Sequence, residues 1–257
     1  MHETKDRKQY MTLFLTSSPT LGWAGDLNPD NGLIDDLRAV MPHPINCVMI
    51  SSFPDDVEIT DRMAWELREC FDHADLSFDH YEVLDRRTEK QAARMIREAN
   101  FIILCGGHVP TENQFFQDIN LRLKLKKFDG VMLTISAGSM NCADVVYSSP
   151  ELEGEAIDPD YKLYFRGLGL TKVNILPHFQ TLRGSMLDGM RLIEDIIANH
   201  SYGHPIYCLT DGAFFVITPD RTELRGHAYK MLNGKLRLVC HHEERKLLDK
   251  NGRLRKL

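Results

Sequence analysis

The chain has 257 residues, 43% of them hydrophobic, and a formal net charge of −6 at pH 7. This length fits one large domain over residues 1–257 better than two, and it supplies enough apolar side chains for a sizeable core. The negative charge and the lack of a Lys/Arg stripe argue against nucleic-acid binding, and no apolar stretch approaches the length of a membrane span.

Along most of the chain, short apolar runs alternate with segments of helical periodicity. Four segments have helical periodicity. One begins at Thr60, one follows a capping-box pair formed by Thr88 and Gln91, one begins near Phe115 and one begins at Leu187. Strands that alternate with such helices predict right-handed βαβ units and a mostly parallel sheet covered on both faces. The apolar runs have the length of buried strands and cover residues 11–15, 46–50, 78–83, 101–105, 131–135, 172–176 and 205–209.

The end of the chain departs from this alternation. Strand-like segments at 214–217, 224–231 and 235–240 follow one another, and Asn233-Gly234 is a strong signal for a two-residue hairpin turn. We therefore predict an α/β fold, a three-layer α/β/α sandwich whose mostly parallel sheet ends in a C-terminal antiparallel hairpin. The charged tail, from about 241 to 257, is expected to form a short solvated helix or to fray.

The cysteines indicate a reduced, cytoplasmic protein. The six of them form no Cys-x-x-Cys pair, and most lie in or beside apolar runs, where cysteine behaves as a small hydrophobe. Residues 1–8 are charged, and no signal-like apolar stretch follows them. His200, His204 and the pair His241-His242 lack companion ligands at metal-binding spacing. We expect no metal and no cofactor.

Ser136 is the strongest candidate for a reactive side chain. It follows the apolar run 131–135 and precedes the small residues Ala137 and Gly138. A serine between a buried strand and a helix stands on a sharp turn with its hydroxyl exposed, which is the nucleophile-elbow arrangement. Thr134 occupies the position two residues earlier, where that motif has glycine. An ordinary serine at a helix N-cap is the alternative that this segment leaves open.

Other polar residues follow neighbouring strands in the same way. Function in an open parallel sheet gathers at the carboxyl ends of its strands, where His178 follows the run 172–176 and Asp211 follows the run 205–209. A serine nucleophile needs a base within hydrogen-bond reach and an acid that orients the base. Ser136, His178 and Asp211 are therefore the predicted catalytic residues.

Two backbone N–H groups complete this predicted site. The glycine pair Gly106-Gly107 can bring a donor close to a developing oxyanion, and the N–H of Ala137 can supply the second. His108, directly after the glycine pair, is a rival base. Glu194 and Asp195 are rival acids, although they fall within a helical pattern where charges usually face solvent.

These segments together resemble the dipeptidase E (aspartyl dipeptidase) and cyanophycinase family of serine peptidases. The resemblance runs from about residue 101 to the 214–217 segment and rests on Gly106-Gly107, Ser136-Ala137-Gly138, Leu176-Pro177-His178-Phe179 and Asp211-Gly212. The order Ser…His…Asp differs from the Ser…Asp…His order of α/β-hydrolases.

This resemblance implies a flavodoxin-like sheet of the class I glutamine amidotransferase type. It also implies Ser136 as nucleophile, His178 as base and Asp211 as orienting acid, with an oxyanion hole near Gly107 and Ala137. The chain departs from the family at two further positions, since Asp211 stands where glutamate is common and His108 follows the glycine pair where asparagine is usual.

The substrate is predicted from the residues around the site. Residues 147–166 form a long connection with several acids, which is typical of an active-site lid and suited to attract the amino group of a short peptide. His108 and Arg166 are predicted to bind substrate, with Arg183 as a second candidate for a substrate carboxylate. We predict a cytoplasmic serine peptidase that hydrolyses small peptides through an acyl-enzyme, with a homodimer left open.

Two other functions remain open from the sequence. The first is a catalytically inactive or regulatory binding module of the same fold. The second is a flavodoxin-like nucleotide- or phosphate-binding protein that uses the Thr16-Ser17-Ser18 turn as an anion nest. The chain has neither Gly-x-Gly-x-x-Gly nor a Walker-type lysine motif to favour the second.

Overall fold

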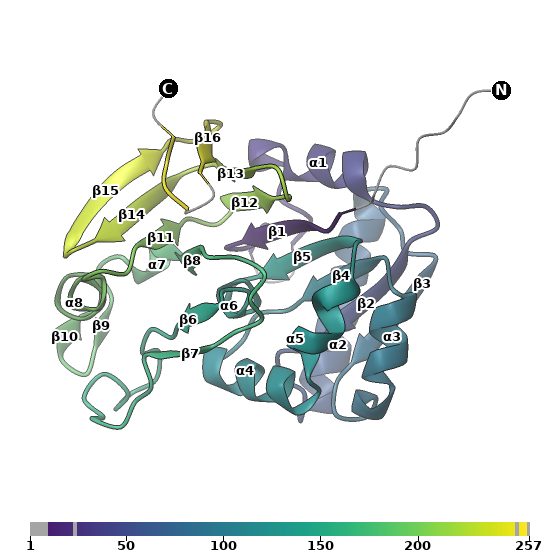
Figure 1. Ribbon diagram of the computed structural model, residues 1–257, viewed down its shortest axis with the longest axis horizontal. Coiled ribbons are helices and arrows are strands. Elements are labelled where there is room, and N and C mark those ends of the chain that lie inside the picture. The colour runs from purple at the N-terminus through teal and green to yellow at the C-terminus, as the bar shows by residue number, and fades with distance from the viewer. Residues whose placement is uncertain (1–9, 23–24, 250–251, 256–257) are drawn as a thin grey trace.

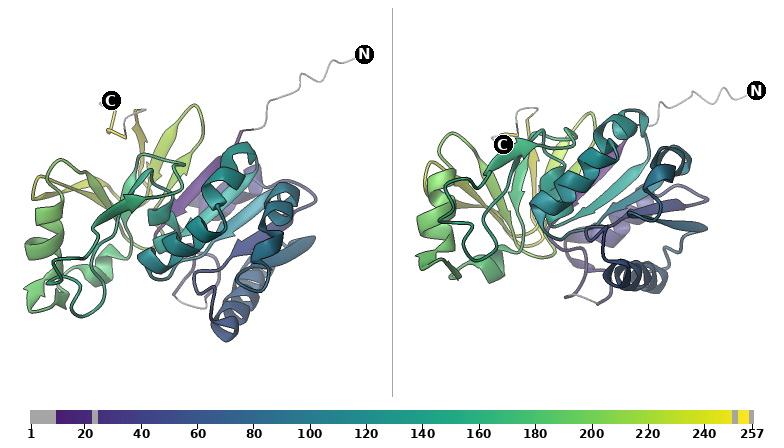
Figure 2. Two further views of the ribbon diagram at one scale, coloured as in Figure 1. Left: turned by 60° about the horizontal axis from the view of Figure 1, so that its bottom comes forward. Right: turned by 90° about the horizontal axis from the view of Figure 1, so that it is seen from below.

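The computed structural model describes residues 10–22, 25–249 and 252–255, so the charged residues 1–8 lie outside it. It has the predicted α/β architecture, with a large, mostly parallel sheet and helices on both of its faces (Figure 1, Figure 2). The main sheet is formed by β1 (Thr12–Thr16), β2 (Asn46–Ile50), β3 (His80–Leu84), β4 (Phe101–Leu104), β5 (Val131–Ile135), β12 (Phe214–Ile217), β13 (Thr222–Arg225) and β16 (Arg245–Leu248).

The order of strands in this sheet is β16-β13-β12-β1-β5-β4-β2-β3. The strands from β1 to β3 pair in parallel, whereas β12, β13 and β16 extend the sheet antiparallel beyond β1. The charged tail was therefore predicted wrongly, because β16 pairs with β13 and buries Leu248. The tail contains few apolar residues, and their pattern is too short to predict a strand.

Helices cover the two faces because successive strand residues point in opposite directions. Phe14 belongs to the cluster under one pair of helices, and its neighbours Leu13 and Leu15 belong to the cluster on the other face. The first face carries α1 (Leu33–Val40) and α2 (Val57–His73), and the second carries α3 (Ala92–Glu98), α4 (Val109–Asp118) and α5 (Leu121–Lys124). Single 3₁₀ turns lie at Asp30–Gly32, Glu89–Gln91 and Leu125–Lys127.

One predicted helix start and one predicted capping box are wrong, although the helix after that box does begin at Ala92 as predicted. Helix α2 begins before Thr60, because the Asp56 side chain caps it by accepting a hydrogen bond from the Ile59 N–H at 3.0 Å. Thr88 forms no capping box with Gln91; its hydroxyl instead donates to the carbonyl of Val83 at 2.8 Å. In both places a side chain forms a hydrogen bond with the backbone that the spacing of residues in the sequence does not predict.

A second sheet carries two of the strands that the sequence assigned to the first. It consists of β8 (Asn174–Leu176), β11 (Ile206–Leu209), β14 (Ala228–Leu232) and β15 (Lys235–Cys240), in the order β15-β14-β11-β8. The predicted hairpin at Asn233-Gly234 is confirmed, since both residues have positive φ and join β14 to β15. Apolar runs identify strands but not their partners, so the separate sheet was not predicted.

The remaining elements lie between and beside the two sheets. The helix predicted from Leu187 is wrong in its first part, because Asp188-Gly189 makes a hairpin turn with two positive φ values. These elements are α6 (Ala137–Asn141), β6 (Val145–Tyr147), β7 (Tyr164–Arg166), α7 (Phe179–Leu182), β9 (Met186–Leu187), β10 (Met190–Arg191), a π-helical segment (Leu192–Ile197) and α8 (Ala198–His200). None of the helices described is long and apolar enough to cross a membrane.

Arg225 ties the antiparallel edge of the main sheet to α1. Its side chain is only 3% exposed, donates from Nε to Glu223 at 2.7 Å and forms an ion pair with Asp36. The nearby Arg221 reaches the same Glu223 from solvent at 3.3 Å and is 53% exposed.

We expect Arg225→Ala to destabilise the protein by about 3–5 kcal/mol, because it leaves the buried carboxylate of Glu223 without its main partner. Arg221→Ala, the matched control, should cost less than about 1 kcal/mol. Urea unfolding of both variants measures the difference. Equal effects would show that burial of the pair does not matter.

Candidate active site

Ser136 stands on a strained turn between β5 and α6. Its φ of 49° and ψ of −116° lie outside the usual regions for a residue with a side chain, a conformation that costs about 1–3 kcal/mol. The Ser136 N–H holds the turn to the end of β1 by donating to the carbonyls of Thr16 and Ser17, each at 3.1 Å. The hydroxyl is thereby directed out of the sheet.

Glycines allow β4 to pass close to this turn. A Cβ atom at Gly138 would lie 2.3 Å from the carbonyl oxygen of Cys105, and one at Gly106 would lie 2.6 Å from that of Ile135. The small residues around Ser136 are therefore required by the approach of two backbone segments.

Thr134 fits beneath the turn where the elbow motif has glycine. It is fully buried, and its hydroxyl donates to the carbonyl of Phe14 at 2.8 Å and lies 2.8 Å from the hydroxyl of Ser139. Because this polar group is satisfied inside the core, threonine is compatible with the strained conformation of Ser136.

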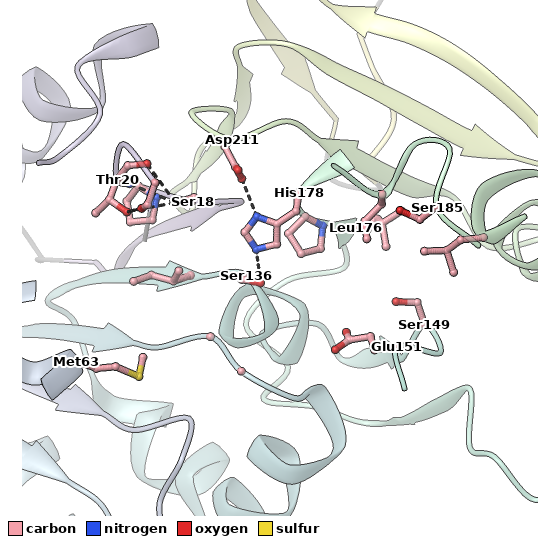
Figure 3. A pocket seen from close by; sticks show the side chains of 18 of the residues that line it. Ser18, Thr20, Met63, Ser136, Ser149, Glu151, Leu176, His178, Ser185 and Asp211 are labelled. Carbon is pink, nitrogen blue, oxygen red and sulfur yellow. Dashed lines mark hydrogen bonds and ion pairs between the residues drawn. The ribbon is translucent and has the colours of Figure 1, made fainter. Parts of the chain in front are cut away.

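The three predicted catalytic side chains lie in one hydrogen-bonded line (Figure 3). His178 Nε2 is 2.8 Å from Ser136 Oγ, and His178 Nδ1 is 2.8 Å from Asp211 Oδ1. Ser136 comes from the main sheet, whereas His178 and Asp211 follow β8 and β11 of the second sheet. The residues therefore converge although the strands do not share one sheet.

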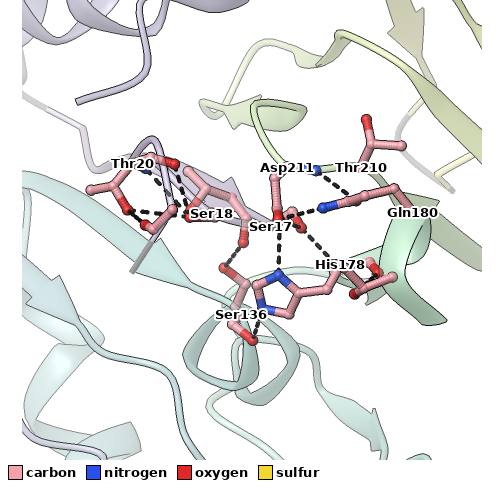
Figure 4. Close-up of polar contacts among 12 residues, drawn as sticks. Ser17, Ser18, Thr20, Ser136, His178, Gln180, Thr210 and Asp211 are labelled. Carbon is pink, nitrogen blue, oxygen red and sulfur yellow. Dashed lines mark hydrogen bonds and ion pairs between the residues drawn. The ribbon is translucent and has the colours of Figure 1, made fainter. Parts of the chain in front are cut away.

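Two residues that the sequence did not single out for this role hold His178 and Asp211 in place (Figure 4). The Ser17 hydroxyl donates to Asp211 Oδ1 at 2.7 Å and accepts from the His178 backbone N–H at 2.7 Å. The Gln180 side chain donates to Asp211 Oδ2 and accepts from the Asp211 N–H. The signal for Gln180 was its position two residues after His178.

These hydrogen bonds decide the charge of Asp211. Partial burial by itself would raise the pKa of Asp211, but hydrogen bonds from His178, Ser17 and Gln180 and the charge of His178 together lower it below its ordinary value. The carboxyl is therefore ionised at neutral pH.

The hydroxyl of Ser136 opens into a cavity of about 570 Å³. Gly107 lines this cavity, as do His178 and Asp211. Ala137 is the first residue of α6, so its N–H has no acceptor within that helix. Most of the remaining wall is apolar and includes Met63, Leu67, Leu176, Leu182, Leu187 and Leu192.

Glu112 lies buried behind the Gly107 loop. Its side chain accepts a hydrogen bond from the amide of Asn141, on helix α6, at 3.3 Å. Desolvation raises the pKa of Glu112 well above its ordinary value, although the Asn141 amide and the Gly107 N–H oppose that shift. The Glu112 carboxyl therefore connects the loop to the helix that follows Ser136.

The other predicted substrate contacts are not among the residues that line this cavity. Arg166 is exposed at the end of β7 and lines a separate cavity of about 300 Å³, so its predicted contact with substrate is not supported. Arg183 lies over the ring of Tyr229, 5.9 Å from its centroid. His108 does not line the main cavity; its Nε2 contacts Glu155 at 3.3 Å.

The rival acids also lie elsewhere. Asp195 pairs with Arg191 at 2.6 Å, and Glu194 is exposed. Within residues 10–22, 25–249 and 252–255, no group of three or more His, Cys, Asp or Glu side chains is arranged to hold a metal ion.

The fold resembles two solved structures of peptidases. A peptidase from an acI-B1 Actinobacterium matches with a TM-score of 0.60 and 15% identity, over 90% of this chain and 95% of that one. A protein from Listeria monocytogenes EGD-e, whose name assigns it to peptidase E, matches with a TM-score of 0.55 and 14% identity, over 89% and 98%. No protein-family model and no curated protein matches the sequence. At these identities the likeness shows the fold.

We expect the Glu112→Gln variant to gain stability over the wild type as the pH rises from 4 to 8. A carboxyl whose pKa is raised by folding stabilises the native state fully below its unfolded pKa of about 4.3 and progressively less above it. The difference should grow by up to about 1.4 kcal/mol per pH unit.

Thermal unfolding of both proteins across this pH range measures the effect of Glu112. Glu153→Gln, at an exposed position, is the control and should show no such trend. A difference between Glu112→Gln and wild type that stays constant with pH would contradict a protonated Glu112.

Proposed function

We propose that the protein is a serine peptidase of the dipeptidase E type that hydrolyses small peptides. The observation that carries the proposal is the line of hydrogen bonds from Ser136 through His178 to Asp211, at the wall of a cavity. The names of the two similar structures support peptidase chemistry. The cavity volume of about 570 Å³ suits a short peptide.

In this proposal His178 acts as the base. Asp211 accepts a hydrogen bond from the protonated Nδ1 of His178, which leaves Nε2 without a proton. Nε2 then takes the proton of the Ser136 hydroxyl while the serine oxygen bonds to the scissile carbonyl carbon. His178 then gives this proton to the leaving amine as the C–N bond breaks, and an acyl-enzyme remains. A water molecule, deprotonated by His178, attacks the ester and releases the acid, and the proton returns to Ser136.

The oxyanion formed in each step needs N–H donors. We assign this role to Ala137, whose N–H begins α6, and to Gly107, which lines the cavity and whose N–H must leave the Glu112 carboxyl to reach the oxyanion. Preorganised donors of this kind stabilise the transition state more than the ground state, and losing one typically costs about 10²–10³ in kcat.

The two alternatives have less support. A phosphate nest at the Thr16-Ser17-Ser18 turn would need free donors, but the Ser17 hydroxyl is engaged by Asp211 and the Ser17 N–H bonds to the carbonyl of Ala213. An inactive module would not require an ionised Asp211 behind His178. A cytoplasmic location remains a proposal, consistent with six buried, unpaired cysteines.

Ser136→Ala should abolish hydrolysis and labelling by a fluorophosphonate probe, because both need the serine oxygen as nucleophile. The fold should persist, since the change removes one oxygen that faces the cavity. Labelling followed by peptide mapping checks the site. The alternative of an inactive module is favoured if the wild-type protein does not react, or if it reacts at another serine.

Asp211→Asn should lower kcat by up to roughly 10⁴-fold, because an amide supports the wrong tautomer of His178. Asp211→Glu should be much milder, since the carboxylate is kept. Asp195→Asn is the matched control and should leave kcat unchanged. These rates are measured on a dipeptide library. A comparable loss in the Asp195 variant would contradict the assignment of the acid.

A further inference from the structure

The cavity beside Ser136 is acidic. Besides Asp211, which is engaged by His178, its described walls carry the carboxyl groups of Glu66 and Glu151. No Lys or Arg is among the described residues that line it. A negatively charged substrate side chain would therefore meet like charges in this cavity and no ionic partner.

Glu151 is a free acid on the side of the cavity opposite Met63 (Figure 3). Its side chain points toward the open space beside Ser136, and among the described residues it has no hydrogen-bond or ion-pair partner. The charge of His178 acts to lower the pKa of Glu151. Glu151 is therefore placed to meet a substrate group close to the scissile bond.

Glu155 holds the backbone at this position. Its Oε2 accepts from the N–H groups of Glu151 at 2.7 Å and Leu152 at 2.9 Å, while its Oε1 contacts His108 Nε2 at 3.3 Å. The loop is thus fixed by one carboxylate, and the other carboxyl is left to face the cavity.

The surroundings of Glu151 favour a cationic partner. Although the residue as a whole is exposed, desolvation of its carboxyl and the charge of Glu155 raise its pKa to about 7, against a smaller opposing effect of His178. A carboxylate in such surroundings is stabilised when an opposite charge comes within hydrogen-bond distance.

We infer that Glu151 binds a cationic group of the substrate residue on the N-terminal side of the scissile bond. The ligand chemistry is an ammonium or guanidinium, from the α-amino group or from a basic side chain, and aspartyl peptides are disfavoured. The inference rests on the proposed peptidase function and adds the substrate class to it.

Four 4-nitroanilides separate the two sources of the charge: lysyl, norleucyl, Nα-acetyl-lysyl and aspartyl. If the side chain binds, the two lysyl compounds should exceed the norleucyl one by roughly tenfold in kcat/KM. If the α-ammonium binds, lysyl and norleucyl should be similar and the acetylated compound slower by the same factor. The aspartyl compound should be the poorest in either case.

Glu151→Gln should remove the preference among these substrates, mainly through KM, while Glu153→Gln, on the same loop but outside the cavity lining, should keep it. A wild-type preference for the aspartyl compound, or a preference unchanged in Glu151→Gln, would overturn the inference. Fluorophosphonate labelling of Ser136 in the same preparation shows whether the proposed function still holds.

Binding without turnover tests the charge preference independently of catalysis. Calorimetry with lysinamide and with the uncharged Nα-acetyl-norleucinamide should give at least roughly tenfold tighter binding of the first, and Glu151→Gln should remove the difference. Equal binding of the two amides to the wild type rejects the role of Glu151, whether or not any peptide is hydrolysed.

Discussion

The hydroxyl of Ser17 joins the two sheets at the point where the reactive side chains meet. It stands at the end of β1 in the main sheet, donates to Asp211 and accepts from the backbone of His178, both of which follow strands of the second sheet. Ser136 is held to the same β1 end through its own N–H. The spacing of Ser136, His178 and Asp211 therefore depends on one buried residue that has no role in the proposed bond breaking.

The sequence predicted which residues meet at the candidate site better than it predicted the sheet that carries them. Ser136, His178 and Asp211 each follow a short apolar run, and a polar residue after a buried strand is a local signal. Pairing of β8 with β11, rather than with the main sheet, depends on contacts between residues distant in sequence. The local pattern of apolar residues does not determine which strands pair, so the separate second sheet could not be predicted.

The substrate-binding residues were the least predictable part of the site. The chemistry of guanidinium groups favoured Arg166 as the partner of a substrate carboxylate. However, β6 and β7 form a two-stranded ribbon that places Arg166 at another cavity. Glu151 and Glu155 were recognised only as members of an acidic connection. Their different roles follow from a few backbone hydrogen bonds to Glu155, which residue type alone does not determine.

Three carboxyl groups near Ser136 illustrate how surroundings decide charge. Asp211 receives several hydrogen bonds, which outweigh its partial burial and lower its pKa, whereas Glu112 is fully buried with few donors and its pKa is raised. Glu151 lies between these cases, with a pKa of about 7. Because hydrogen bonds fix the charge of Asp211 and burial raises the pKa of Glu112, Glu151 is the carboxyl among the three whose charge can respond to what enters the cavity. In the proposed mechanism, one acid would select the substrate by charge and another would orient the base.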